Sequence, residues 1–129
     1  METRLTHRLD LRLKVTLGVD EEFKNKFVLA DGNNFEAEAL DISVSGIGII
    51  SKYYIPTGLI VILEIPGKIF GLKDNIKTKA EIRYCKFIKS CEYRCGIKFL
   101  DMSEEYKNAI VKFISIYEKR KEPRLKLSE

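Results

Sequence analysis

The feature that most constrains this fold is a change of hydrophobic period towards the end of the chain. Before about residue 100, apolar residues recur at every second position, in short runs that Gly, Pro, Asn and Asp interrupt. After Ser103 they recur at spacings of three and four. The first pattern is typical of half-buried strands and the second of an amphipathic helix. We therefore predict a mainly β fold, a small antiparallel β-barrel with a C-terminal amphipathic α-helix.

Alternation also locates the individual strands. The expected strands, six or seven in number, are 11–19, 26–30, 35–43, 47–51, 59–65, 78–87 and 93–99. The last two form the best-patterned hairpin of the chain. Within 78–87 the spacing directs Ala80, Ile82 and Tyr84 inward. The phase slips at Cys85, which predicts a bulge or a strand end at that point.

The helix has a clear start and a clear expected end. Its apolar stripe consists of Tyr106, Ile110, Phe113, Ile114 and Tyr117. Ser103 can cap its first turn, and Pro123 is expected to stop it. We therefore divide the chain into a flexible arm (1–10), the barrel with its helix (11–121) and a tail (122–129).

Composition and charge indicate one soluble globular domain. The chain has 129 residues, a net charge of +4 and 33% charged residues. Its longest apolar run, Leu59 to Leu63, is far shorter than the ~20 residues of a membrane span. No apolar segment follows the charges near Met1, so we expect no signal peptide and a cytoplasmic protein.

The number and spacing of the cysteines favour a structural role for their thiols. Cys85, Cys91 and Cys95 make an odd number, which argues against a disulfide framework. The sequence has no Cys-x-x-Cys, and its single histidine, His7, is far from the cysteines. We therefore expect reduced cysteines that pack in the core, and neither a metal nor a cofactor.

A basic segment precedes the first strand. Arg8 lies in the arm, and Arg12 stands four residues later at the start of the strand, on its outer face. Two guanidinium groups at this spacing can hold one compact anion or one planar base. Arg4 and Arg8 have the same spacing, but only Arg12 directly starts the strand. A solvated basic arm is the simpler alternative.

A polar interruption follows the strand 35–43. Asp41 and Ser43 continue its apolar phase, so two polar side chains take positions where apolar ones are expected. Gly46 and Gly48 then permit a positive φ or a close backbone approach. A carboxylate, a hydroxyl and bare backbone at one strand end can receive donors from a ligand. The same residues also suit a turn in which the side chains bond their own backbone.

Taken in order, these segments resemble the PilZ domain family. The segment Arg8-Leu9-Asp10-Leu11-Arg12 is similar to its RxxxR motif, and Asp41-Ile42-Ser43-Val44-Ser45-Gly46 to its DxSxxG motif. Gly96-Ile97-Lys98-Phe99 and the helix start at Ser103 are similar to its last elements. The resemblance extends from about Arg8 to Tyr117.

The resemblance implies a six-stranded antiparallel β-barrel that acts as a non-catalytic bacterial receptor for cyclic di-GMP. Arg8 and Arg12 would hold guanine and phosphate, and Asp41, Ser43 and Gly46 would line the other half of the site. His7 occupies a position that in the family influences how many ligand molecules bind. Ligand binding would then order the arm and signal to a protein partner.

Two other functions remain open. One is a PilZ-like protein-interaction module that binds no nucleotide. The other is a small nucleic-acid-binding barrel, which the basic ends and the tyrosines would suit. Nucleic-acid binding should weaken steeply with salt, which distinguishes it. An enzyme is least supported, because the sequence offers one histidine and no nucleophile–base pair.

Overall fold

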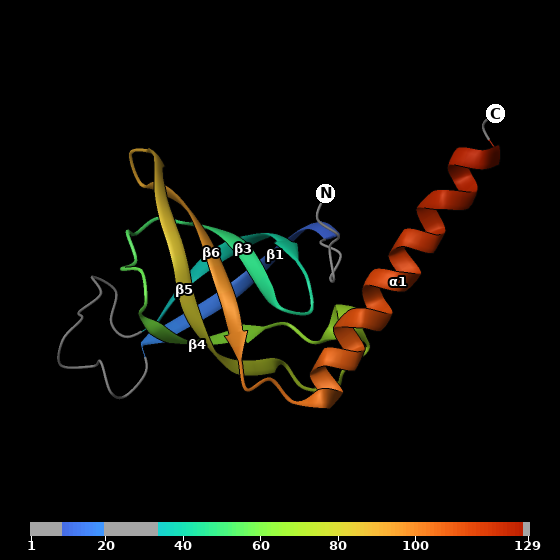
Figure 1. Cartoon of the computed structure of the whole chain (residues 1–129), viewed down its shortest axis with the longest axis horizontal. Coiled ribbons are helices and arrows are strands. Elements are labelled where there is room, and N and C mark those ends of the chain that lie inside the picture. The colour runs from blue at the N-terminus through green and yellow to red at the C-terminus, as the bar shows by residue number, and fades with distance from the viewer. Residues whose placement is uncertain (1–8, 20–33, 128–129) are drawn as a thin grey trace.

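A computed structural model gives the fold of the chain (Figure 1). It describes the backbone of residues 9–19 and 34–127 and the side chains of 9–18 and 34–117. The elements are β1 (Leu9–Val19), β2 (Asn34–Ile42), β3 (Gly46–Ser51), β4 (Ile60–Ile65), the short 3₁₀ helix η2 (Lys68–Phe70), β5 (Ile76–Lys89), β6 (Glu92–Leu100) and α1 (Glu104–Leu127). The strand expected at 26–30 lies outside the described residues.

The six strands close into an antiparallel barrel, which confirms the predicted fold. Their order is β1-β2-β3-β6-β5-β4, and β4 pairs with β1 to complete the ring. The predicted hairpin is also confirmed, since β5 and β6 pair along their length and project beyond the other strands (Figure 1). Closure leaves none of these strands with an unpaired edge, which removes a route to aggregation.

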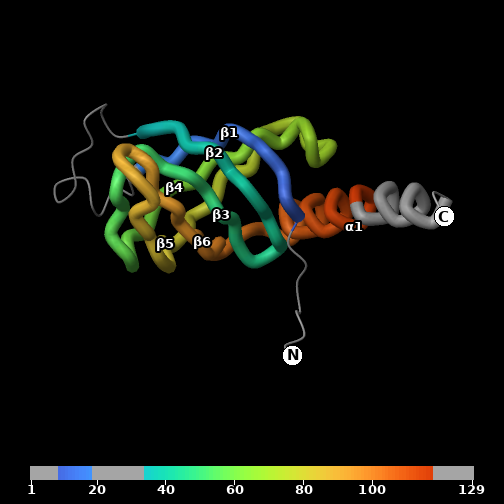
Figure 2. The backbone as a smooth tube through the Cα atoms, turned by 90° about the horizontal axis from the view of Figure 1, so that it is seen from above, coloured from blue at the N-terminus to red at the C-terminus, as the bar shows by residue number. Residues whose placement is uncertain are grey.

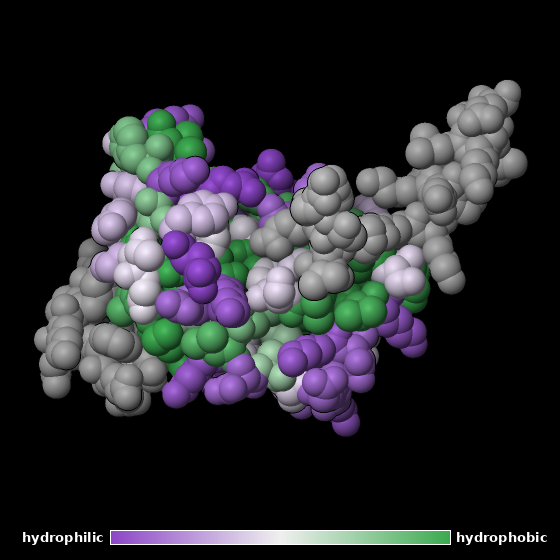
Figure 3. Space-filling view, in the orientation of Figure 1, coloured by the Kyte–Doolittle hydropathy of each residue, from purple (hydrophilic) through white to green (hydrophobic). Residues whose placement is uncertain are grey.

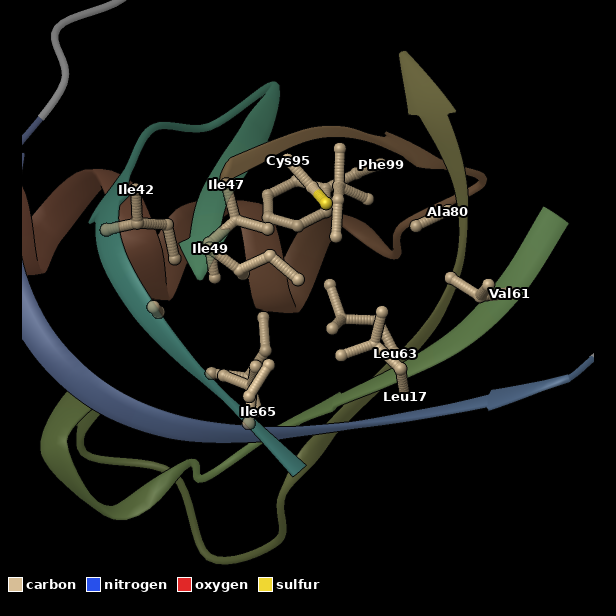
Figure 4. Packing of buried hydrophobic residues seen from close by; sticks show 14 of the residues in the cluster. Leu17, Ile42, Ile47, Ile49, Val61, Leu63, Ile65, Ala80, Cys95 and Phe99 are labelled. Carbon is tan, nitrogen blue, oxygen red and sulfur yellow. The ribbon is translucent and has the colours of Figure 1, made fainter. Parts of the chain in front are cut away.

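The barrel interior is filled by aliphatic side chains from every strand (Figure 4). Fully buried members include Val15, Leu17, Ile42, Ile47, Ile49, Leu63, Ile65 and Ile82. Each such side chain contributes about 1.5–3 kcal/mol to the free energy of unfolding. The rigid wall that results is the platform on which the outer side chains are presented.

Helix α1 covers one end of the barrel and then leaves it (Figures 1 and 2). The hydroxyl of Ser103 accepts a hydrogen bond from the Tyr106 amide at 3.3 Å, which confirms the predicted cap. Ile110 is fully buried. The Phe113 ring packs edge-on against the Phe70 ring of η2, with 5.0 Å between the ring centroids. No helix among the described residues is long and apolar enough to span a membrane.

The predicted end of the helix was wrong, because α1 passes through Pro123 and continues to Leu127. A proline inside a helix cannot donate the backbone hydrogen bond to the carbonyl four residues earlier, here Lys119, and it crowds that carbonyl, so it weakens the helix locally. The amides that follow it can resume the helical pattern.

Two register shifts reverse predicted side-chain directions. One lies between Ala39 and Asp41 in the β2–β3 pairing, so Ile42 and not Asp41 enters the core. Alternation had predicted that Asp41 continues the apolar phase of the strand, and this prediction was wrong. The second shift, between Ile82 and Tyr84, confirms the bulge expected near Cys85. It also turns Tyr84 outward, where it is 38% exposed, so its predicted inward direction was wrong.

Candidate functional site

A row of four residues crosses the outer face of the barrel. Asp41 of β2 pairs with Gly48 of β3, Gly48 with Gly96 of β6, and Gly96 with Tyr84 of β5. The row faces outward, because Ile47, next to Gly48, points into the core and is fully buried. Its two middle positions carry no side chain.

The glycines of this row make room for its two outer members. A Cβ atom added at Gly48 would lie 2.9 Å from Asp41 Oδ1, and one added at Gly96 would overlap the Tyr84 ring. The carboxylate therefore lies over β3 and the aromatic ring lies over β6. Close approach, rather than an unusual φ, is what requires glycine here.

Arg94 of β6 forms an ion pair with Asp41. Its Nη2 donates a hydrogen bond to Asp41 Oδ2 at 3.0 Å, and the side chains of Arg94 and Asp41 are 37% and 11% exposed. The pKa of Arg94 is raised, first by hydrogen bonding with Tyr84 and also by Asp41, against the opposing effect of burial. Arg94 is therefore a fixed cation with part of its guanidinium open to solvent.

Arg12 lies on the outer face of β1, as predicted. Its ion-pair partner is Glu38, whereas Asp41 pairs with Arg94. Arg12 Nη1 lies 3.1 Å from Glu38 Oε1, and the two side chains are 74% and 49% exposed. So exposed a pair contributes little to stability and is easily exchanged for another partner.

A groove of about 560 Å³ lies over β1, β2 and β3. Its lining consists of Arg12, Leu13, Lys14, Glu36, Ala37, Glu38, Ile50 and Lys52. Three cations and two carboxylates give it a small positive excess. Ile50 of the lining pairs across strands with Arg94, so the groove borders the Asp41–Arg94 pair. Its volume is typical of small-molecule sites.

Ser43 and Gly46 shape the turn between β2 and β3. The Ser43 hydroxyl is fully buried and accepts hydrogen bonds from the amides of Ser45 and Gly46, both at 3.2 Å. Ser43 therefore bonds to the backbone of its own turn, which is the alternative that the sequence left open. A Cβ at Gly46 would overlap the Ile97 carbonyl oxygen, so glycine is needed where β3 passes close to β6.

The structure brings some of the predicted site residues together. Asp41, Ser43 and Gly46 share one end of the β2–β3 hairpin, and Arg12 lies on the same outer wall. Arg8 and His7 fall outside the described residues. Among the residues that are described, no group of three or more His, Cys, Asp or Glu side chains could hold a metal.

Sequence reasoning missed Arg94 and misdirected Tyr84. The outward phase of Arg94 was visible in the alternation of β6, but its partner Asp41 is 53 positions away. No local pattern reports such a pairing. The predicted direction of Tyr84 was wrong because the bulge lies between Ile82 and Tyr84, ahead of the phase slip at Cys85.

Solved structures with the same fold come from several bacteria. The motility inhibitor MotI/DgrA of Bacillus subtilis superposes with a TM-score of 0.73 at 17% identity, over 95% of this chain and 54% of its own. Escherichia coli YcgR, solved in complex with c-di-GMP, gives 0.68 at 15% identity, over 98% of this chain and 50% of its own. The chain thus spans about half the length of these two proteins.

Two further comparisons cover a separate domain and a sequence relative. The PilZ domain of YcgR alone, solved with c-di-GMP, matches with a TM-score of 0.60 over 99% of both chains. A protein of Aquifex aeolicus described as uncharacterized is 37% identical over 78 residues, which are 58% of this chain and 35% of that protein.

The family assignment rests on the sequence as well as the fold. The family described as PilZ domain matches residues 2–115, nearly the whole chain. This match includes both predicted motifs, the closed barrel and the first half of α1. The chain belongs to the PilZ domain family.

Proposed function

We propose that this chain is a receptor that binds cyclic di-GMP on the outer wall of its barrel, without catalysing a reaction. The family and the c-di-GMP complexes of YcgR support this ligand. The observation that carries the proposal is the arrangement of Arg12, Asp41, Arg94 and Tyr84 on one wall, beside a groove of about 560 Å³.

The chemistry of this wall fits a guanine nucleotide. A guanidinium can donate two hydrogen bonds to guanine O6 and N7, or bind a phosphate bidentately. Asp41 can accept from guanine N1–H and the N2 amino group. Tyr84 is 38% exposed, and Lys86 Nζ lies 5.5 Å from the centroid of its ring. A guanine base that displaced Lys86 could stack on this ring, and base–aromatic stacking contributes about 1–3 kcal/mol. The ligand would exchange the weak Arg12–Glu38 pair for a stronger contact.

The remaining motif residues have supporting roles in this proposal. Ser43 and Gly46 hold the turn that fixes Asp41 at the strand end. Leu9 pairs with Ile42, so the chain enters β1 beside that same end. Arg8, covalently attached to Leu9, is assigned to the phosphate or guanine there, and His7 to the edge of the site. Closure of the arm over the ligand would change the surface offered to a protein partner.

Isothermal titration with cyclic di-GMP at physiological salt tests the site. Arg12→Ala should weaken binding by about 5- to 150-fold, the equivalent of ~1–3 kcal/mol. Arg12→Lys retains the charge but not the planar fork, so it should recover little of the loss. Asp41→Ala should also weaken binding although it removes a negative charge, and cyclic di-AMP serves as the control ligand.

The sign of the Asp41 effect separates recognition of guanine from a general basic surface. A basic surface would bind the dinucleotide more tightly after Asp41→Ala and about equally well after Arg12→Lys. Either result, or equal binding of cyclic di-AMP, would contradict the proposal.

A second candidate, an interaction module without nucleotide, is favoured by one observation. The tip of the β5–β6 hairpin carries exposed apolar residues beside hydrophilic ones (Figure 3), and Phe87 and Ile88 there are 66% and 49% exposed. Such a tip suits contact with another protein. If the folded wild-type chain gave no heat of binding with cyclic di-GMP, the interaction module would be favoured over the nucleotide receptor.

A further inference from the structure

Two of the three cysteines face each other inside the barrel wall. Cys85 of β5 and Cys95 of β6 are directly paired across the strands. Their Sγ atoms are 3.1 Å apart, and the Cys95 thiol donates a hydrogen bond to the Cys85 sulfur. The number and spacing of the cysteines predicted only packing thiols, since this pairing depends on the register of β5 and β6.

The bulge in β5 is what brings the sulfurs together. It lies between Ile82 and Tyr84 and returns Cys85 to the inward phase of the strand. Residues that are directly paired in antiparallel strands have Cα atoms about 4.5–5.5 Å apart. Disulfides span Cα separations of about 4.4–6.8 Å, so this backbone can accommodate a bond. The sulfurs need to approach by only about 1 Å, to the ~2 Å of an S–S bond.

The two sulfurs differ in environment. Cys95 is fully buried among core side chains (Figure 4), and this burial, with the Cys85 contact, raises the pKa of its thiol. Cys85 is only half-buried, and its sulfur accepts a second hydrogen bond from the Ile55 amide at 3.3 Å. We therefore expect a small oxidant to react first with Cys85. Cys95 is buried, and its sulfur contacts that of Cys85. Cys91 is exposed in the hairpin turn, and neither cysteine pairs with it.

We propose that Cys85 and Cys95 form a reversible disulfide when the protein reacts with hydrogen peroxide. The Cys85 thiol gives its proton to solvent, and its sulfur attacks one peroxide oxygen. The O–O bond breaks, hydroxide leaves and takes up a proton, and Cys85 becomes a sulfenic acid. The Cys95 sulfur then attacks the Cys85 sulfur, and the released hydroxide takes the Cys95 proton. In sum two thiols lose two electrons, and the peroxide is reduced to two waters.

The cysteine pair lies next to the residues of the candidate binding site. Tyr84 precedes Cys85, and Arg94 and Gly96 flank Cys95, so the disulfide would form directly beneath the outer-wall residues. The proposal does not depend on nucleotide binding, since it concerns only the two thiols and the oxidant.

The test uses the full wild-type chain, reduced and then freed of reductant. We expect hydrogen peroxide to remove the mass of two hydrogens and to leave one of three thiols open to alkylation. Trypsin places the cysteines on three separate peptides, because Lys or Arg lies between each pair. The peptides 84–86 and 95–98 should be joined, and the peptide with Cys91 should carry the alkyl group. Dithiothreitol should restore three free thiols.

Cys91→Ser provides the matched control, because Cys91 is exposed and lies outside the pair. This variant should still lose two hydrogens, whereas Cys85→Ala in the same background should not. Should Cys85→Ala fail to fold by circular dichroism, the peptide map of the wild-type chain decides alone. Oxygen addition at Cys91 while Cys85 and Cys95 remain free thiols would overturn the proposal. Disulfide-linked dimers formed through Cys91 alone would do the same.

Discussion

Two adjacent rows of residues cross the same four strands, and they are built in opposite ways. The inner row consists of Ile42, Ile47, Ile97 and Ile82, which pair in that order across β2, β3, β6 and β5. The outer row, one position along each strand except at the β5 bulge, consists of Asp41, Gly48, Gly96 and Tyr84. The inner row is almost completely buried, while the outer row contributes Asp41 and Tyr84 to the candidate site.

The difference shows how one backbone serves stability on one face and binding on the other. Branched side chains fill the interior, and their burial is the main source of the free energy of unfolding. On the outside, two missing side chains let a carboxylate, a guanidinium and an aromatic ring lie close together. Four predictions test whether the two rows are as separate as this arrangement implies, in order of decreasing effect.

Truncation of the inner row should have the largest effect on stability. Ile47→Ala should lower the free energy of unfolding by about 2–5 kcal/mol, because it leaves a cavity in the barrel. Denaturant titration measures this loss. The control Tyr84→Ala, in the outer row, should cost clearly less, because that side chain is 38% exposed. Equal losses in the two variants would mean that the outer row is part of the core.

The Asp41–Arg94 pair should show measurable coupling. A double-mutant cycle of Asp41→Ala and Arg94→Ala should give about 1–2 kcal/mol, between the values typical of exposed and of buried pairs. The matched cycle is Lys14→Ala with Glu36→Ala, whose charged atoms lie 3.9 Å apart on exposed side chains. It should give a coupling near zero, and a coupling as large as that of Asp41 and Arg94 would contradict the distinction.

The outer glycines should be sensitive through their neighbours. Gly96→Ala should cost about 1 kcal/mol, because the added methyl group displaces the Tyr84 ring, which can swing into solvent. NMR of the Tyr84 ring should show its displacement, while Gly48→Ala should move Asp41 and leave that ring in place. In a Tyr84→Ala background, Gly96→Ala should become nearly neutral. A full cost in that background would show that the ring is not the reason for glycine.

The smallest effect is expected at the exposed Arg12–Glu38 pair. Glu38→Gln should change the free energy of unfolding by less than about 0.5 kcal/mol, because both side chains are largely solvated. The same variant frees Arg12 and should tighten cyclic di-GMP binding by about twofold or less. Thermal melts and titration calorimetry measure the two effects. Weaker binding after Glu38→Gln would mean that Glu38 itself contacts the ligand.

The sequence by itself determined the architecture. The switch from period two to period three and four predicted a barrel followed by a helix, and both are present. It also identified the β5–β6 hairpin and the Ser103 cap, because turns, caps and alternation depend on residues close in the chain. These features are local, so a local pattern can report them.

The sequence located Arg12 and Asp41 as candidate site residues, but only the tertiary structure decided which side chains they meet. Alternation directed Asp41 and Tyr84 inward, but bulges before each of them turned both outward. The Asp41–Arg94 and Cys85–Cys95 pairs likewise follow from the register of strands that meet only in the closed barrel. Register is set by how whole strands pair and pack, and one extra residue reverses every side chain beyond it. No short stretch of sequence contains that information, which is why the fold was predictable and the contacts of its outer wall were not.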